Sequence, residues 1–263
     1  MKPENELNLF LNKFAFRREM AGYIGVEREH FLEINAEIND CLPSLCVPYA
    51  EWFLRNISDD RWTYELSACQ VESRTNPQID LSALKFELYE NMNLGNATAQ
   101  KMGIYLVNHE VADRFMPLDV YPDPRYLEIV KRISEEELRA ACRVAGTHIH
   151  IGARDINHAI AINNLLVPHI DTLCRISDHS NGERLRLYKT MAKSWQPTTY
   201  ENPEHLFEIA KTEGFIDNPR NCWKLIRVSI HGTIELRMFG ATNSIDEILE
   251  WVSLVKYLIK EVM

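Results

Sequence analysis

Two hydrophobic periods divide the chain, one typical of strands and one typical of helices. Apolar and polar positions alternate strictly over residues 23–34 (YIGVEREHFLEI) and 146–153 (GTHIHIGA), which predicts two strands. The run CWKLIRVSI, then a histidine, then GTIELRMFG covers residues 222–240 and predicts two strands at a tight turn or one bent strand. Extended chain is also expected at 61–77, which ends at an Asn-Pro pair, and at 104–111.

Helical periodicity fills most of the rest of the chain. Asp80 is a plausible N-cap for a long helix over 80–92, and Gly214 closes another. Ser244 and Glu247 have the spacing of a capping box before the last helix. At the N-terminus Leu7, Phe10, Leu11 and Phe14 have the spacing of an amphipathic helix, within a lead of residues 1–22. The other expected helices are 49–56, 124–144 in one or two pieces, 156–176, 183–194, 202–214 and 248–262.

The strand patterns favour an α+β fold. Their faces alternate polar with apolar residues, which is typical of antiparallel or mixed sheets with one half-exposed face. Helices would then pack on the other side of the sheet. No internal repeat or linker-like run divides the 263 residues, so one domain over 1–263 is the simplest organisation.

Composition narrows the classes of function. A net charge of -9 argues against broad binding to nucleic acid, which requires a basic surface. The charged N-terminus lacks the apolar core of a secretory signal, and no run approaches the roughly 18 apolar residues of a membrane span. Six scattered cysteines without a CxxC pair are expected to be reduced thiols of a cytoplasmic protein. They are Cys41, Cys46, Cys69, Cys142, Cys174 and Cys222.

Three predicted strands each place a pair of ionisable groups on one face. These pairs are Glu27 with Glu29, His148 with His150, and Glu235 with Arg237. Taken singly, each pair suits an ordinary solvent-exposed sheet face. Packed together, the carboxylates would repel one another without a counter-ion, and carboxylates with imidazoles suit hard divalent cations.

Two further carboxylates, Glu65 and Glu72, lie seven residues apart in YELSACQVES. On a regular strand they would face opposite sides, so both serve one site only if a bulge or bend separates them. The sequence has no GxxxxGK[ST] loop, no GxGxxG after a strand and no GxSxG elbow. Any binding of ATP would therefore go through metal ions held on a sheet.

Four spaced motifs resemble one enzyme family. GVEREHFL, QVESRTNP, GTHIHIG and DNPRNCWKLIRVSIHGTIELRMFG have the order and form found in carboxylate–amine ligases of the glutamate–cysteine ligase type 2 family. The resemblance implies a glutamine-synthetase/guanido-kinase-like antiparallel sheet and a single catalytic domain. It also implies use of ATP with Mg²⁺ or Mn²⁺ to phosphorylate a carboxylate, after which an amine attacks the acyl phosphate.

The resemblance also implies roles for individual residues. Arg237 and Glu27 would be catalytic, and His148, His150 and Arg237 would bind the nucleotide. Arg74 and Arg227 would bind the substrate. The metal ligands would be Glu27, Glu29, Glu65, Glu72, His148 and Glu235.

Two other functions stay open from the sequence. His-x-His with carboxylates also suits a metal-dependent hydrolase that activates water. A non-catalytic relative that binds a nucleotide or an amino acid is the second alternative. For the ligase, the expected partners are a small amino acid and an amine, without nucleic acid or membrane, and a homo-oligomer is compatible with it.

Overall fold

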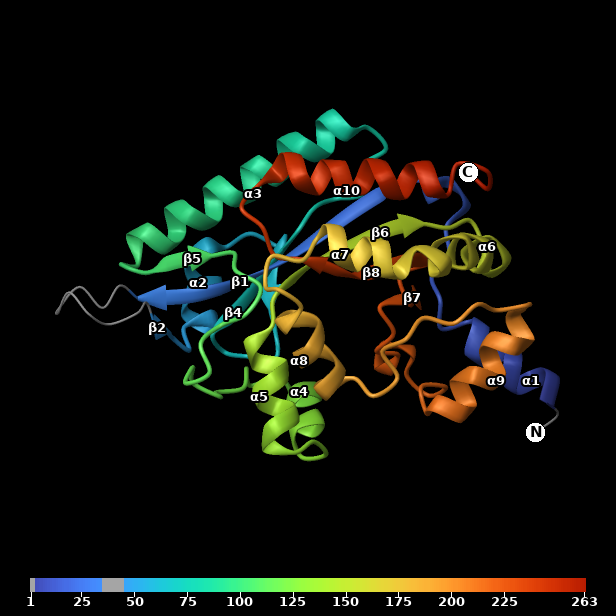
Figure 1. Cartoon of the computed structure of the whole chain (residues 1–263), viewed down its shortest axis with the longest axis horizontal. Coiled ribbons are helices and arrows are strands. Elements are labelled where there is room, and N and C mark those ends of the chain that lie inside the picture. The colour runs from blue at the N-terminus through green and yellow to red at the C-terminus, as the bar shows by residue number, and fades with distance from the viewer. Residues whose placement is uncertain (1–2, 35–44) are drawn as a thin grey trace.

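An eight-stranded antiparallel sheet organises the computed structural model, which describes residues 3–34 and 45–263 (Figure 1). Six strands follow the order β3-β4-β1-β6-β8-β7, while β2 and β5 both pair with β1. All pairings among the described strands are antiparallel. The strands are β1 (Ile24–Ile34), β2 (Leu45–Cys46), β3 (Trp62–Tyr64), β4 (Gln70–Arg74), β5 (Tyr105–Val107), β6 (Gly146–Gly152), β7 (Ile226–Ser229) and β8 (Thr233–Gly240).

Helices lie on both sides of this sheet (Figure 1). The pair α3 and α10 runs side by side along one face, whereas α4, α5 and α8 lie across the other. The helices are α1 (Pro3–Leu11), α2 (Ala50–Ile57), α3 (Leu81–Lys101), α4 (Pro124–Val130), α5 (Glu135–Arg143), α6 (Ile156–Leu166), α7 (Ile170–Ile176), α8 (Glu183–Met191), α9 (Pro203–Glu213) and α10 (Ile245–Leu258). This arrangement confirms the predicted α+β class, with a second group of helices opposite the first.

The main core lies between the sheet and the helices on the α3/α10 side. Val26 of β1, Ile149 of β6 and Leu236 of β8 point there and are fully buried, together with Leu88 of α3 and Val252 of α10. Period-two alternation turns the intervening polar residues of these three strands to the opposite face. The sheet therefore has one apolar face that holds the fold together and one polar face.

The extended segment 61–77 is not one strand. β3 and β4 pair with each other, and the chain between them turns. In that turn Ala68 N–H donates to the Asp119 carbonyl at 2.8 Å, and the Cys69 carbonyl accepts from Leu32 N–H at 2.9 Å. Because β3 folds back on β4, with Thr63 opposite Glu72, residues before and after the turn can face the same side.

Residues 222–240 form two strands at a tight turn, which settles the two alternatives left open by the sequence. Gly232 in that turn has φ +72°, a left-handed conformation that glycine adopts without steric cost. A Cβ at this position would lie 2.4 Å from the carbonyl oxygen of Ala15. The turn thus fixes β7 against β8 and packs against the segment after α1.

Several helix boundaries differ from the sequence predictions. Asp80 does cap α3, but the helix continues past Met92 to Lys101. Gly95 within it leaves room for the Trp62 ring, since a Cβ there would lie 2.5 Å from that ring. The predicted helix 156–176 is interrupted at Val167–His169 by a 3₁₀ turn containing proline.

The expected capping box at the last helix is only half formed. Ser244 Oγ accepts from Glu247 N–H at 3.2 Å, as predicted. The Glu247 carboxylate, however, accepts from the Thr242 hydroxyl at 2.7 Å and pairs with His179 at 3.0 Å. The Glu247 side chain therefore binds Thr242 and His179 instead of the backbone N–H of Ser244.

The N-terminal lead contains the expected helix. Phe10 of α1 is buried and packs at 5.2 Å from Phe14 and 5.6 Å from Phe207 of α9, measured between ring centroids. The five cysteines in the described residues are free thiols, and Cys41 lies outside the described residues. In the described part of the chain, no helix combines the length and the apolar character that a membrane crossing requires.

Candidate active site

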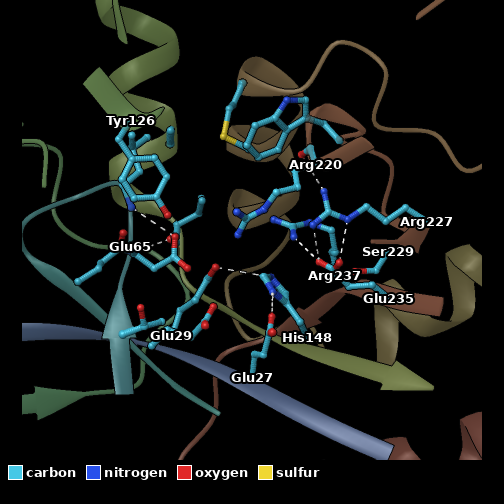
Figure 2. A pocket seen from close by; sticks show the side chains of 18 of the residues that line it. Glu27, Glu29, Glu65, Tyr126, His148, Arg220, Arg227, Ser229, Glu235 and Arg237 are labelled. Atoms are coloured by element: carbon cyan, nitrogen blue, oxygen red, sulfur yellow. Dashed lines mark hydrogen bonds and ion pairs between the residues drawn. The ribbon is translucent and has the colours of Figure 1, made fainter. Parts of the chain in front are cut away.

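A cavity of about 290 Å³ opens over the polar face of the sheet, between the strands and the helices α4, α5 and α8. All ten site residues predicted from the sequence line this cavity, although they come from separate segments of the chain. They are Glu27, Glu29, Glu65, Glu72, Arg74, His148, His150, Arg227, Glu235 and Arg237. In Figure 2 Glu29 and Glu65 lie on one side and the side chains of Arg220, Arg227 and Arg237 on the other, where Glu235 lies among them.

The histidines contact the first carboxylate of β1. β6 pairs with β1 in a register that sets His148 opposite Glu27. His148 Nδ1 lies 3.3 Å from Glu27 Oε2, and His150 Nε2 lies 3.3 Å from the same oxygen. The remaining nitrogen of His150 is fixed by the Thr233 hydroxyl at 2.8 Å. One carboxylate oxygen therefore lies between two imidazole rings.

Three carboxylates from different segments converge beside this pair. β4 sets Glu72 opposite Glu29 of β1, and the turn after β3 brings Glu65 to the same place. Glu29 is held by Gly146 N–H, which donates to its Oε2 at 2.6 Å. The bend between Glu65 and Glu72, one of the two alternatives from the sequence, is therefore present.

Glu235 is held by two arginines. Arg227 donates from Nε to Oε2 at 2.8 Å and from Nη2 to Oε1 at 3.0 Å, which is a bidentate pair. Arg237 also donates to Oε1, and its Nε donates to the Tyr188 hydroxyl at 3.2 Å. Two further N–H groups of Arg227 donate to backbone carbonyls, so most of its five donors are in use.

The ionisation of these groups follows from burial and from their neighbours. Burial, with the carboxylates of Glu27 and Glu65, raises the pKa of Glu72 well above its ordinary value. Burial would also raise the pKa of Glu27, but the two histidines hold it well below its ordinary value. Despite burial, Arg227 and Arg237 lower the pKa of Glu235. The pKa values of Glu72 and Glu235 therefore shift in opposite directions, because their charged neighbours differ in sign.

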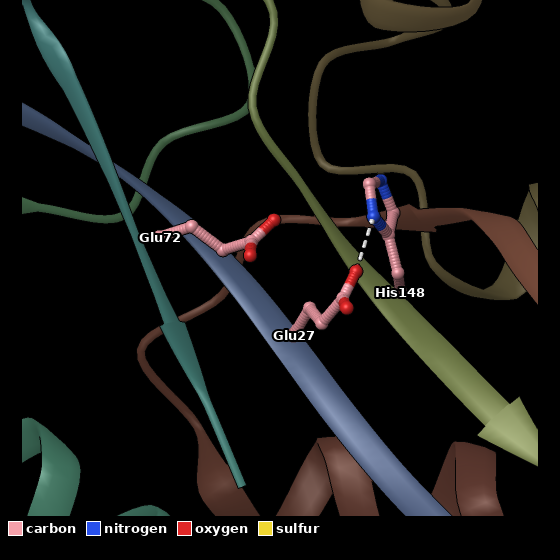
Figure 3. A group of neighbouring side chains, drawn as sticks. All are labelled: Glu27, Glu72 and His148. Carbon is pink, nitrogen blue, oxygen red and sulfur yellow. Dashed lines mark hydrogen bonds and ion pairs between the residues drawn. The ribbon is translucent and has the colours of Figure 1, made fainter. Parts of the chain in front are cut away.

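Three groups of side chains have the geometry to share a cation. Within each group the ligand atoms lie within 4.8 Å of one another. One group is Glu27, Glu72 and His148, drawn in Figure 3. The others, in the described residues, are Glu27 with His150 and Glu235, and Glu29 with Glu65 and Glu72.

These donors fit a hard divalent cation. Carboxylate oxygens with one imidazole suit Mg²⁺ or Mn²⁺, and thiolates, which favour softer metals, are absent from all three groups. His150 Nε2 is buried and forms no well-aligned hydrogen bond, but it lies 3.3 Å from Glu27 Oε2, so both atoms could face one cation. His150, predicted from the sequence only for nucleotide binding, therefore belongs to a cation group as fully as His148 does.

Arg74 and Arg227, the expected substrate-binding residues, differ in availability. Arg74 is 43% exposed at the edge of the cavity, 4.0 Å from Glu72, and donates to the Asp60 carbonyl at 2.9 Å. Arg227 is committed to Glu235 and to the carbonyls of Arg220 and Cys222. The guanidinium of Arg74 consequently has more N–H donors available to a substrate than that of Arg227 has.

The sequence patterns did not predict the cavity-lining residues that lie opposite the sheet, in helices and loops. Tyr126 of α4 and Tyr188 of α8 line the cavity, as do Arg125, Arg184 and Arg220. Arg184 is 5% exposed and donates to three backbone carbonyls, which fixes the ends of β6 and β8. These residues lie in helices and loops without a recognisable motif, so only the tertiary packing identifies them.

Comparisons with known proteins support a ligase fold. The chain is 27% identical over 218 residues, 77% of its length, to a glutamate–cysteine ligase of Natronomonas pharaonis. It is also 27% identical over 216 residues, 76% of its length, to a glutamate–cysteine ligase of Haloferax volcanii. The chain spans about 60% of the length of each of these relatives. No family model matches the chain.

Solved structures agree on the fold. A bifunctional glutathione synthetase from Pasteurella multocida superposes with a TM-score of 0.57 at 11% identity, over 98% of this chain and 40% of that one. A Plasmodium falciparum glutamine synthetase gives 0.51 at 11% identity, over 98% of this chain and 55% of that one. These likenesses confirm the predicted glutamine-synthetase-like α+β fold. The chain is therefore a distant homologue of proteins named glutamate–cysteine ligase, and its fold is like that of glutathione synthetase and glutamine synthetase.

Proposed function

We propose that the chain is an ATP- and Mg²⁺-dependent carboxylate–amine ligase that forms an amide bond through an acyl phosphate, on glutamate or a similar amino acid. One observation carries the proposal. Five glutamates, two histidines and Arg237, from segments up to about 200 residues apart, converge on a single cavity. The relatives named glutamate–cysteine ligase are consistent with this class of reaction. We propose residues 1–263 as one catalytic domain.

The arrangement suits phosphoryl transfer to a carboxylate. Such a transfer requires neutralisation and alignment of phosphate charge more than covalent help from the protein. Divalent cations held by Glu27, Glu29, Glu65, Glu72, Glu235 and the histidines would supply the neutralisation. Either His148 or His150 can complete the ligand set with Glu27.

Arg237 is the proposed contact to the transferred phosphoryl group. Its side chain is 12% exposed, faces the cavity and is oriented by Glu235 and Tyr188. A guanidinium fixed on two sides presents its remaining N–H donors in a defined direction, which favours planar contact with phosphoryl oxygens. Transfer of the phosphoryl group to the substrate carboxylate would release ADP. Attack of the amine on the acyl carbon would then release phosphate and a proton.

The first prediction is that ATP binding depends on the divalent cation. Without it, the phosphates would meet a cavity lined by five carboxylates, three of them within one group at 4.8 Å or less. In calorimetry we expect ATP affinity to fall by at least about 100-fold when EDTA replaces Mg²⁺ or Mn²⁺. Equal affinity under both conditions would contradict the metal-bridged site.

A screen for ADP release tests the function itself. Mg-ATP is supplied with pairs of amino acids, beginning with glutamate and aspartate as acids and cysteine and other amines as acceptors. The ligase predicts ADP release that requires both the acid and the divalent cation. A metal-dependent hydrolase would show turnover without coupling to ATP, and a non-catalytic binding relative would release no ADP with any pair.

A further inference from the structure

Two of the six arginines in the cavity have no assigned partner. Arg184 donates to three backbone carbonyls, Arg227 and Arg237 hold Glu235, and Arg74 lies near Glu72 and donates to the Asp60 carbonyl. Arg125 and Arg220 also line the cavity. Within residues 3–34 and 45–263, neither of their guanidinium groups forms an ion pair with a carboxylate.

Arg125 is the more informative of the two. Its Nε is buried and has no hydrogen-bond partner. A buried donor without a partner costs free energy, so such an atom in a ligand cavity indicates a missing acceptor. The backbone of Arg125 is fixed by Asp123, whose Oδ1 accepts from Arg125 N–H at 2.9 Å as the cap of α4. The guanidinium also lies 5.6 Å from the centre of the Tyr126 ring.

Arg220 completes the pair from the other side of the cavity. It belongs to the 3₁₀ turn Pro219–Asn221, and its carbonyl accepts from Arg227 Nη1 at 3.1 Å. Figure 2 shows Arg220 on the same side as Arg227 and Arg237, with Tyr126 and Glu65 opposite. Burial, together with the guanidiniums of Arg220 and Arg227, lowers the pKa of Arg125, as expected if these like charges are close together.

We infer that Arg125 and Arg220 form a clamp for a carboxylate of the amino-acid substrate, the one that is not activated. This inference rests on the proposed ligase function. Such a substrate carries a second carboxylate, which must be neutralised away from the carboxylate-lined floor of the cavity. Arg227 has few donors left for this task, and Arg237 faces the reacting group. Two guanidiniums match a carboxylate in charge and in planar geometry.

A carboxylate fits this position better than a nucleotide phosphate. The phosphates are expected over the glutamates and histidines, where cations can bridge them to the protein. Arg125 and Arg220 come from α4 and from the turn before β7, outside the three cation groups. Neither arginine belongs to a cation group, although Arg125 lies near Glu65, and a guanidinium pair is a direct oxyanion site that amino-acid carboxylates use without a bridging metal.

The test compares acids with their α-amides in calorimetry. Wild-type protein with Mg²⁺ and a non-hydrolysable ATP analogue is titrated with glutamate, isoglutamine, aspartate and isoasparagine. We expect one acid to bind about 10- to 100-fold more tightly than its α-amide. Arg220→Gln and Arg125→Gln should each remove most of that preference. Arg132→Gln, an exposed arginine just after α4, serves as the matched control and should retain it.

Four results would overturn the clamp. Three of them are equal binding of acid and α-amide by the wild type, an unchanged preference in both variants, and weaker binding of the ATP analogue with an unchanged preference. Absence of binding by all four compounds would also overturn it. Arg220 is exposed, so Arg220→Gln is expected to fold, and its thermal unfolding is measured beside the wild type. Failure of the ligase function is distinguished by the absence of ADP release, whatever the amide preference.

Discussion

Changing Arg237 to lysine is expected to lower turnover by about 10²- to 10³-fold while ATP affinity changes less than about threefold. Lysine keeps the positive charge but lacks the planar fork. It also lacks the Nε–H that donates to the Tyr188 hydroxyl at 3.2 Å, so its ammonium group would not be oriented as the guanidinium is. A contact made mainly in the transition state affects turnover more than binding of the ground state.

The measurement is steady-state ADP release with calorimetry of Mg-ATP on the same preparation. Arg186→Lys is the matched control, since Arg186 is an exposed residue of α8 whose guanidinium pairs with Glu183 at 3.7 Å. Near-normal turnover of Arg237→Lys would show that Arg237 is a structural partner of Glu235. A parallel loss of ATP affinity would instead assign it to ground-state binding.

Changing Glu27 to glutamine is expected to abolish ADP release, by at least about 10³-fold, equivalent to roughly 4 kcal/mol of transition-state stabilisation. Glu27 belongs to two of the three cation groups in the described residues and lies 3.3 Å from both His148 and His150. Glutamine keeps the shape of the side chain but loses the charge that binds the cation. Loss of ADP release and loss of Mn²⁺ binding should therefore occur together.

Glu33→Gln is the matched control for this change. Glu33 lies on the same strand and the same face as Glu27 and is 5% exposed, but it lines a different cavity with Cys46 and His109. Its replacement should leave ADP release within about threefold of the wild type. Retained activity in Glu27→Gln would place the cation elsewhere and remove the basis for the proposed phosphoryl transfer.

Local periodicity was sufficient to predict which side chains share a face. Glu27 with Glu29, His148 with His150, and Glu235 with Arg237 lie on one face of the sheet, because alternation in a strand depends only on the strand itself. The α+β class followed from the same alternation, since it requires an apolar face and a polar face. The resemblance to a ligase family added the expectation that these three strands share one site.

Features that depend on distant partners could not be predicted in the same way. Glu65 and Glu72 share the cavity because the chain turns back between β3 and β4, and in that turn Ala68 N–H donates to the Asp119 carbonyl. The Glu247 carboxylate does not complete the capping box because it binds the Thr242 hydroxyl and His179. Each outcome depends on contacts between segments far apart in the chain.

The helices that cover the cavity were found as elements but not as parts of the site. Periodicity over 124–144 predicts an apolar stripe without saying what the stripe faces. Tyr126 and Arg125 lie at the start of α4, a helix with no fully buried residue, so their pattern resembles an ordinary surface turn. Only the packing of α4 across the polar face of the sheet places them beside Glu65.

Hydroxylamine trapping tests for the acyl phosphate itself. Hydroxylamine is small enough to reach an activated carbonyl whatever the natural amine is. With glutamate or another accepted acid, and with Mg-ATP, we expect one hydroxamate for each ADP and each phosphate released, and neither hydroxamate nor ADP from Glu27→Gln. If glutamate, aspartate and the other carboxylates tried give no ADP, or if ADP accumulates without hydroxamate, the acyl-phosphate ligase is contradicted.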